Sequence, residues 1–357
     1  MAIKNIEDLR RHVALAIDVE LSTIPPYLYA LYSIEDPRSE AALLIRSIVA
    51  EEMLHAALAA NLLLGLGGEP TFAAAATVPT YPNLLPHHKP DLVLNLAPCS
   101  DDLIRNSLMV IEQPEAHDAP AEDDDFETLG QFYHAIEIAI DELGASVDLF
   151  ANPQRDRQLA DPSFYAPVAY DASDSGGLML VDDAASADEA IEIIVHQGEG
   201  LSDERWADPS HQELTHYYKL EQIARGISPL GPVRPALTNP TTATLPAEVQ
   251  PVSELFNALY RYTMLTLDQL FEPSPDKAPL VDRLYALMSS ALAPVARYLM
   301  ELPVGDGAVA GPTFELFEFG GDPAAELGAM IDEVSRTHER LATLRELPLA
   351  TPARACG

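Results

Sequence analysis

Two short motifs combine a carboxylate with an imidazole at the spacing of one helical turn. They are Glu52-x-x-His55 and Glu213-x-x-His216. Residues at positions i and i+3 share a helix face, so the two side chains of each motif can converge on one cation. A lone Glu-x-x-His is common on helices, but both motifs here fall on apolar stripes, where buried carboxylates need a compensating charge. The pattern therefore predicts a buried metal site built from two helices.

Two further carboxylates occupy similar positions on other helical segments. Glu20 stands between Ile17 and Ile24, and Glu137 lies one turn from Tyr133 at the edge of its stripe. One Glu, a Glu-x-x-His, one Glu and a second Glu-x-x-His form the ligand set of ferritin-like di-iron and di-manganese carboxylate proteins. Four carboxylates and two neutral imidazoles suit a pair of divalent ions.

The carboxylate that accompanies His216 is left open by the sequence. In the stretch HQGEG at 196–200, Glu199 is flanked by two glycines, which allow close approach of the backbone. Either Glu199 or Glu213 therefore completes the set of ligands.

Other polar side chains lie close to these positions along the helices. We expect hydrogen bonds to the metal ligands from residues within about one turn of them, namely Tyr27, Tyr133, His134 and Tyr217. The alternative for each tyrosine is ordinary packing. Glu51 is turned roughly 100° from its neighbour Glu52 on a helix, so we expect it to face solvent.

Helical periodicity dominates the segments that must position these residues. Helices are predicted over 5–34, 39–65, 100–113, 126–151, 186–198, 210–226, 252–272, 276–302 and 322–345. The proline-rich stretch 69–99 and the irregular stretch 151–186 are predicted to be long crossing loops. The fold class is therefore all-α: a ferritin-like four-helix bundle with long crossing loops and additional C-terminal helices. We divide the chain into a metal-binding bundle (1–228), a proline-rich linker (229–251) and a helical extension (252–357) that packs on the bundle.

The first helix contains Pro25 and Pro26 in its middle. Proline has no backbone N–H, so the carbonyls of Leu21 and Ser22 lose their helical hydrogen bonds. The hydroxyls of Ser22 and Thr23 are close enough in sequence to reorganise this turn. We expect the break to aim Glu20 at the metals and to open space beside them.

Composition excludes several classes of partner. Against 21 Lys and Arg stand 56 Asp and Glu, and a net charge of −35 repels nucleic acid and anionic membranes. Cys99 and Cys356 form neither a disulfide framework nor a cysteine zinc site. The N-terminus lacks a signal-peptide core, and the uninterrupted apolar runs are too short to span a bilayer. We expect a cytoplasmic protein.

Several stretches resemble a known family. ELSTIPPYLYALYSI, AEEMLHAALAANLLLGLGG, FYHAIE, HQGEG, ELTHYYKLEQI and AGPTFELF are similar to the ferritin-like family named for iminophenyl-pyruvate dimer synthase. This domain occurs in enzymes of violacein and related bisindole biosynthesis. The resemblance covers about residues 8–226 and, more loosely, 252–320.

The resemblance implies a ferritin-like fold, a dinuclear iron centre and a role in secondary-metabolite oxidation. It also implies a set of metal ligands: Glu20, Glu52, His55, Glu137 and His216, with Glu199 or Glu213 as the remaining carboxylate. Two features depart from the family pattern. The chain is expected to be free-standing, without a large partner domain, and 151–188 contains no assignable motif, so that substrate identity is expected to reside there.

Together these observations predict a non-haem di-iron oxidase or oxygenase that depends on O2. Its substrate is expected to be a small amino-acid-derived or aromatic molecule of secondary metabolism. Two Fe ions (or a Mn/Fe pair) are the expected cofactors, with O2 as co-substrate, a reductase or other electron donor as partner, and a monomer or homodimer as the assembly. The reaction outcome stays open among hydroxylation, desaturation, coupling and cleavage. The alternatives are a ferritin-like iron-binding or peroxide-scavenging protein without organic substrate, and a metal-free helical interaction protein.

Overall fold

A computed structural model describes residues 3–74, 78–115, 120–122, 125–166, 176–198 and 214–349. Within these ranges the protein is helical, with two short antiparallel strand pairs: β1 (Asn83–Leu84) with β2 (Val93–Leu94), and β3 (Pro303–Gly305) with β4 (Ala308–Val309). The predicted all-α fold class is confirmed.

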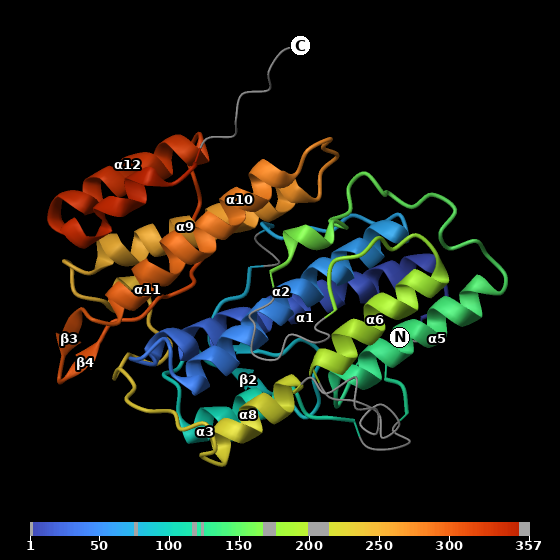
Figure 1. The fold of residues 1–357 in the computed structure, drawn as a ribbon, viewed down its shortest axis with the longest axis horizontal. Helices are drawn as coiled ribbons and strands as arrows, with labels where there is room; N and C mark the ends of the chain where they lie inside the picture. Colours follow the sequence, from blue (N-terminus) through green and yellow to red (C-terminus); the bar gives the residue numbers. More distant parts are fainter. Residues whose placement is uncertain are drawn as a thin grey trace, which may run out of the picture.

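Two long helices run side by side through the middle of the molecule (Figure 1). They are α1 (Ile6–Ser33) and α2 (Glu40–Gly65). The side chains of Asn5 and Ser39 accept backbone N–H groups at the two helix starts, which satisfies donors that have no partner within the helix. Ser39 is the predicted cap of the second helix, and this prediction is confirmed.

Shorter helices pack along this long pair in two groups (Figure 1). The first group is α5 (Leu129–Gly144) with α6 (Ala184–Gly198). The second is α3 (Asp101–Leu103), a π-helical segment (Ile104–Leu108), α4 (Met109–Ile111) and α8 (His216–Ala224). Helix α2 packs against both α6 and α8, so the two groups share the same long helix.

The two groups meet near the middle of the long helices. A Cβ added at Gly198, the last residue of α6, would lie 3.3 Å from Oε2 of Glu112, the residue that follows α4. The third bundle helix, predicted over 126–151, is shorter in the structure, where α5 covers only Leu129–Gly144.

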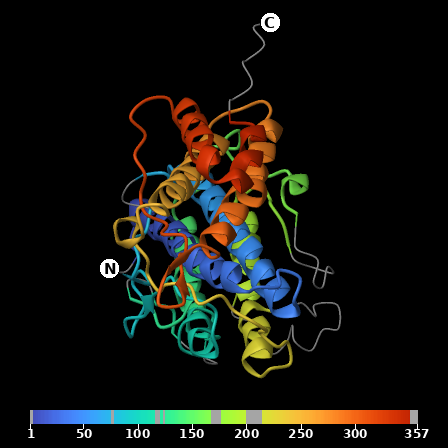
Figure 2. The same cartoon turned by 90° about the vertical axis from the view of Figure 1, so that its left-hand side faces the viewer.

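The remaining helices form a layer over the long pair (Figures 1 and 2). They are α9 (Gln250–Leu270), α10 (Ala278–Ala286), a π-helical segment (Leu287–Leu292), α11 (Ala293–Leu299) and α12 (Pro323–Thr337). Short 3-10 helices complete the set: Pro162–Phe164, Thr242–Thr244 and Glu339–Glu346. Helix α11 packs on α1, where Arg297 Nη1 donates to the Ile34 carbonyl at 3.1 Å. The division at 229–251 stays a prediction.

Helix α1 continues through the proline pair as one helix from Ile6 to Ser33. The Ser22 hydroxyl donates to the Val19 carbonyl at 2.7 Å, and Thr23 Oγ1 lies 2.8 Å from the Glu20 carbonyl. Both hydroxyls therefore bond within the turn, but to the carbonyls of Val19 and Glu20 and not to those of Leu21 and Ser22. The predicted break is absent, because α1 stays helical through the prolines.

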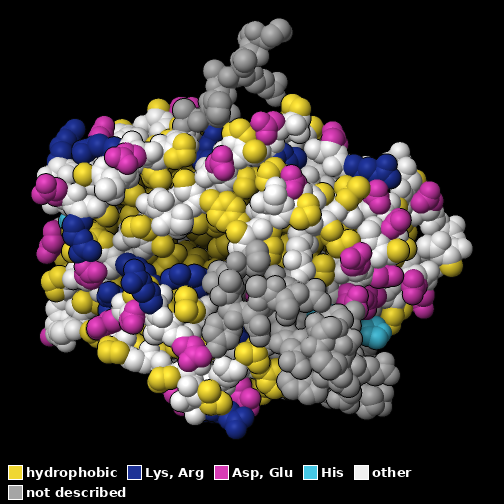
Figure 3. Space-filling view, viewed as in Figure 1, with side chains coloured by type: hydrophobic (Ala, Val, Ile, Leu, Met, Phe, Trp, Pro, Cys, Tyr) yellow, Lys and Arg dark blue, Asp and Glu magenta, His cyan; other side chains and the backbone are white. Residues whose placement is uncertain are grey.

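The surface carries acidic and basic side chains between apolar ones. On the face shown in Figure 3, acidic side chains are scattered among apolar and neutral ones, and Lys and Arg gather in smaller groups. Within the described residues, Glu40–Gly65 is long and apolar enough to cross a membrane by composition, yet 83% of its most apolar window is buried inside the protein, as in a core helix.

Candidate metal centre

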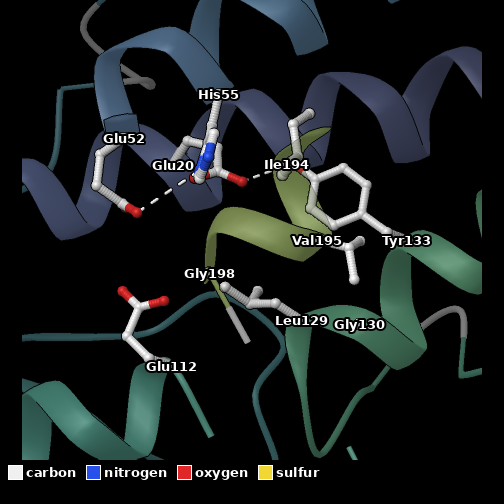
Figure 4. Close-up of a pocket in the computed structure, with 10 residues that line it drawn as sticks. All are labelled: Glu20, Glu52, His55, Glu112, Leu129, Gly130, Tyr133, Ile194, Val195 and Gly198. Carbon is white, nitrogen blue, oxygen red and sulfur yellow. Dashed lines mark hydrogen bonds and ion pairs between the residues drawn. The ribbon is translucent and has the colours of Figure 1, made fainter. Parts of the chain in front are cut away.

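One group of ligand-type side chains joins the two long helices. Glu20 of α1 and Glu52 and His55 of α2 bring one ligand atom each to within 4.8 Å of one another. Nδ1 of His55 lies 3.6 Å from Glu20 Oε2 and 3.6 Å from Glu52 Oε1. All three residues are at most 2% exposed. We call this group site A; Figure 4 shows it from the pocket side.

A second group shares Glu52 with site A and adds residues from the helices that pack on the long pair. Nδ1 of His216 lies 3.1 Å from Glu52 Oε1 and 3.3 Å from Glu112 Oε2. His216 is fully buried, and its ring stacks with that of His55 at 5.4 Å between centroids. We call this group site B. Two adjacent groups with a common carboxylate have the layout of a dinuclear centre.

The residues present fit divalent metal ions. Among the described residues, buried Nδ1 of His216 has no hydrogen-bond partner, although two carboxylates face it. Buried carboxylates cost several kcal/mol unless a cation or hydrogen bonds compensate them. Carboxylate oxygens and neutral imidazole nitrogens are the donors that iron and manganese accept. A cation at each group would satisfy both the unpartnered nitrogen and the buried charge.

The pKa values of the metal-free residues show the same need for positive charge among the buried carboxylates. Burial raises the pKa of Glu52, and the Glu112 carboxylate raises it further. Burial alone would lower the pKa of His55, but the Glu20 carboxylate outweighs it and the net pKa is raised. For His216 the Glu112 carboxylate likewise overcomes burial and holds the pKa well above its ordinary value. In the metal-free protein, bound protons therefore balance part of the buried negative charge that a metal ion would balance.

Hydroxyl groups fix the orientation of all three carboxylates. Tyr133 of α5 donates to Glu20 Oε1 at 2.6 Å, and Tyr27 of α1 donates to Glu112 Oε1 at 2.5 Å. The Thr23 hydroxyl lies within hydrogen-bond reach of Glu52. Burial raises the pKa of both tyrosines well above their usual value, and the neighbouring carboxylates add to the effect, so both hydroxyls keep their protons.

The outer nitrogens of the two histidines meet different partners. Nε2 of His55 lies 2.9 Å from the Gln197 side-chain oxygen, while Nε2 of His216 lies 2.8 Å from Glu51 Oε2. Glu51 also accepts from the buried ammonium of Lys219. Burial would raise the pKa of Glu51, but the hydrogen bond from His216 and the charge of Lys219 lower it.

Two of the predicted supporting residues are therefore close to the carboxylates, and two are not. Tyr27 and Tyr133 bond to them directly. His134 is exposed, and Tyr217 is partly exposed and packs edge-on against Tyr218. The expectation that Glu51 faces solvent is wrong: it is 3% exposed, because α8 places His216 and Lys219 over it.

Glu137 does not join either group. It lies half-buried one turn beyond Tyr133 on α5, where burial and the nearby Asp188 raise its pKa to about 7. Among the described residues, Glu112 supplies the carboxylate that we had assigned to Glu137. The physical reason is that the carboxylate near the middle of the bundle comes from the end of α4, whereas α5 reaches Glu20 with Tyr133. Glu199 and Glu213 lie outside the described residues, so their assignment as ligands stays a prediction.

Four residues of the centre lie outside the predicted set, and the sequence held a signal for two of them. Glu112 follows Ile104 and Leu108 at helical spacing and so lies on a buried stripe. Glu51 stands in a helix that is apolar almost all round, which is typical of a helix without a solvent face. For Gln197 and Lys219 no sequence signal was available beyond their closeness to the HQGEG stretch and to His216.

A pocket opens onto the acidic side chains from the α5 and α6 side (Figure 4). His55 also lines it, and its other walls are mostly apolar: Leu129, Gly130, Tyr133, Ile194, Val195 and Gly198. The carboxylates Glu20, Glu52 and Glu112 therefore border a space with little polar surface apart from their own oxygens and the His55 ring.

A helical bundle with a metal-capable carboxylate–histidine centre defines the class of the protein. The family model described as Ferritin-like matches residues 13–225, more than half of the chain, and the protein belongs to the ferritin-like family. A ferritin-like protein from Caulobacter vibrioides has a similar crystal structure, with a TM-score of 0.61 and 25% identity over 87% of this chain and 100% of that one.

Two curated relatives that the chain matches are a dimerase and a synthase. The chain is 26% identical to 2-imino-3-(indol-3-yl)propanoate dimerase of Chromobacterium violaceum, over 87% of this chain and 34% of that protein. It is also 26% identical to dichlorochromopyrrolate synthase of Lentzea aerocolonigenes, over 98% of this chain and 39% of that protein. The chain thus spans little more than a third of the length of these relatives.

Proposed function

We propose that the protein is a non-haem di-iron enzyme that uses O2 to oxidise a small amino-acid-derived or aromatic molecule in secondary metabolism. The observation that carries the proposal is the pair of buried groups that share Glu52, with the unpartnered Nδ1 of His216 between two carboxylates. When bound, two iron ions would supply the redox chemistry needed to activate O2.

The chain's own residues would hold the metals and control protons around them. Glu20 and His55 would hold one ion, Glu112 and His216 would hold the other, and Glu52 belongs to both groups. Tyr133 and Tyr27 keep protons beside Glu20 and Glu112, because burial holds their pKa values high. Carboxylates suit this role because they can bridge or shift coordination as the charge of the metal changes.

The apolar pocket and the relatives support an organic substrate. Leu129, Ile194 and Val195 line the pocket beside the carboxylates, and this apolar lining favours an apolar or aromatic group over a hydrated ion. The name of one relative contains an indole-bearing imino acid. Since this chain spans only part of that relative, we propose only this compound, 2-imino-3-(indol-3-yl)propanoate, as the first substrate to assay.

Metal analysis and O2 consumption test the proposal. The purified protein is expected to bind about two equivalents of Fe(II) after anaerobic reconstitution, and fewer than about 0.2 equivalents would refute it. Glu52→Ala and His55→Ala are expected to abolish O2 consumption by the Fe(II)-loaded protein while circular dichroism stays helical. Turnover like that of the wild type in both variants would refute the site.

The iron-binding or peroxide-scavenging alternative makes a different prediction in the same assay. It requires Fe(II) oxidation that is indifferent to any organic molecule, together with a large cage on gel filtration. The proposed oxidase function requires that a substrate such as 2-imino-3-(indol-3-yl)propanoate accelerates O2 uptake and is itself consumed.

A further inference from the structure

The two histidines of the centre differ in what stands behind them. Each ring turns Nδ1 toward the carboxylates that would hold a metal, so with a metal bound at Nδ1 the outer Nε2 would carry the ring's proton. Behind His216 that proton meets the carboxylate of Glu51 at 2.8 Å. Behind His55 it meets the neutral side-chain amide of Gln197 at 2.9 Å.

Glu51 is held as a charged acceptor by a second contact. Lys219, itself 3% exposed, donates to the same carboxylate oxygen that accepts from His216. His216 and Lys219 are one turn apart on α8, so one short helix brings both the metal-facing ring and the cation that balances Glu51. A buried carboxylate with this balance accepts a hydrogen bond from the imidazole without adding net charge to the core.

A carboxylate behind a metal-binding histidine increases the basicity of the ring and fixes its orientation. Removing such a partner typically lowers metal affinity 10- to 100-fold. A neutral amide also orients the ring but withdraws the proton less strongly, because charge-assisted hydrogen bonds are roughly twice as strong as neutral ones.

We propose that the two metal positions are unequal: site B, backed by the His216–Glu51–Lys219 chain, binds a divalent metal more tightly and fills before site A, which is backed by Gln197. Glu51 and Lys219 are then positioning residues that act through His216. This inference rests on the proposed function, because it requires that both groups bind metal.

Titration of the metal-free protein with Co(II), followed by visible absorption and calorimetry, tests the proposal without any assay of activity. The wild type is expected to show two binding constants about tenfold or more apart. His55→Ala should keep the tight equivalent, and His216→Ala should keep the weak one. A single constant for both equivalents in the wild type would overturn the proposal.

Exchanging the outer partners gives the sharper comparison. Glu51→Gln should weaken the tight equivalent about tenfold or more and shift the ligand-field band of that Co(II) alone, with the weak equivalent unchanged. Gln197→Glu should strengthen the weak equivalent, a gain that a merely structural role would not produce. Glu51→Asp should restore part of the lost affinity. Glu221→Gln is the matched control, since it removes a carboxylate from α8 that pairs with Arg225 near the surface.

The outcomes separate this inference from the proposed function. No Co(II) or Fe(II) bound by the wild type would refute the function itself. Two equivalents bound by the wild type, with unchanged constants in Glu51→Gln and Gln197→Glu, would overturn the inference and leave the function standing. If Glu51→Gln does not fold, Gln197→Glu decides alone, because its expected effect is a gain in affinity at site A.

Discussion

The hydroxyl of Tyr81 donates to the carbonyl oxygen of Ser22 at 2.7 Å. In an unbroken helix this carbonyl would accept from the residue four positions later, which is Pro26 and has no N–H. The loop that carries Tyr81 thus replaces one of the two hydrogen bonds that the prolines remove, two residues after Glu20. This contact explains how α1 continues past two prolines while its carboxylate stays aimed at His55.

Tyr81→Phe should therefore destabilise the protein without removing a metal ligand. Leaving the buried Ser22 carbonyl unsatisfied is expected to cost about 1–3 kcal/mol in the free energy of unfolding. Chemical denaturation measures the loss, and Tyr217→Phe, at a partly exposed tyrosine, is the control. Equal stability of both variants would show that Ser22 finds another partner.

Metal stoichiometry distinguishes Glu112 from Glu137. Glu112→Gln removes a charged donor from site B and should weaken binding of one equivalent by about 10-fold or more. Glu137→Gln, a substitution of the same kind on α5, should leave both equivalents in place. Colorimetric iron analysis after anaerobic loading and desalting measures both. Loss of a metal in Glu137→Gln instead would return that residue to the ligand set.

The raised pKa values predict how pH acts on the metal-free protein. The pKa of Glu52, His55 and His216 is higher in the folded chain than in the unfolded one. The folded state therefore binds more protons, and stability that is fully present at low pH is lost as the pH rises through the raised values. The melting temperature of the chelator-treated protein should fall between about pH 6 and pH 8.

A bound metal should oppose this loss of stability with rising pH, because it takes the place of the protons. Affinity for Fe(II) should increase with pH over the same range, by up to about tenfold per pH unit for each proton displaced. Chelator competition at several pH values measures it. Affinity that is flat between pH 6 and pH 8 would mean that the ligands carry no protons to displace.

The AGPTFELF stretch gives a prediction away from the metal. A Cβ at Gly311 would lie 2.0 Å from the hydroxyl oxygen of Tyr29, which is buried and donates to the Leu237 carbonyl. Gly311→Ala must displace that ring, and overpacking of this kind costs about 1–3 kcal/mol. Gly328→Ala in α12, where an added Cβ meets nothing within 4 Å, is the control. Thermal unfolding of both variants decides the comparison.

The sequence predicted the helices and part of the centre for the same reason. Glu20, Glu52, His55 and His216 interrupt apolar stripes, and a polar residue on a stripe is a local signal that needs no knowledge of the fold. The structure brings these four together.

The misassigned residues depended on how helices meet, which local periodicity does not report. Glu137 stands at the edge of the apolar stripe of α5, and local periodicity does not show that Tyr133 takes the position next to Glu20 or that Glu112, which follows α4, joins site B. Glu51 is turned about 100° from Glu52 on α2, which predicts solvent exposure, yet α8 covers this face. Both errors come from tertiary packing, which decides whether a residue at the edge of an apolar stripe is exposed to solvent or buried.

The meeting of the two short-helix groups at the centre has a consequence for how this protein could diverge. The long pair α1 and α2 carries Glu20, Glu52 and His55, so any change to its register would move three ligand-type side chains at once. By contrast, Leu129 of α5 and Ile194 and Val195 of α6 line the pocket without belonging to either group of ligand-type side chains. Exchanges at these three positions would reshape the pocket and leave the register of the long pair unchanged, so libraries for new substrates should be concentrated there.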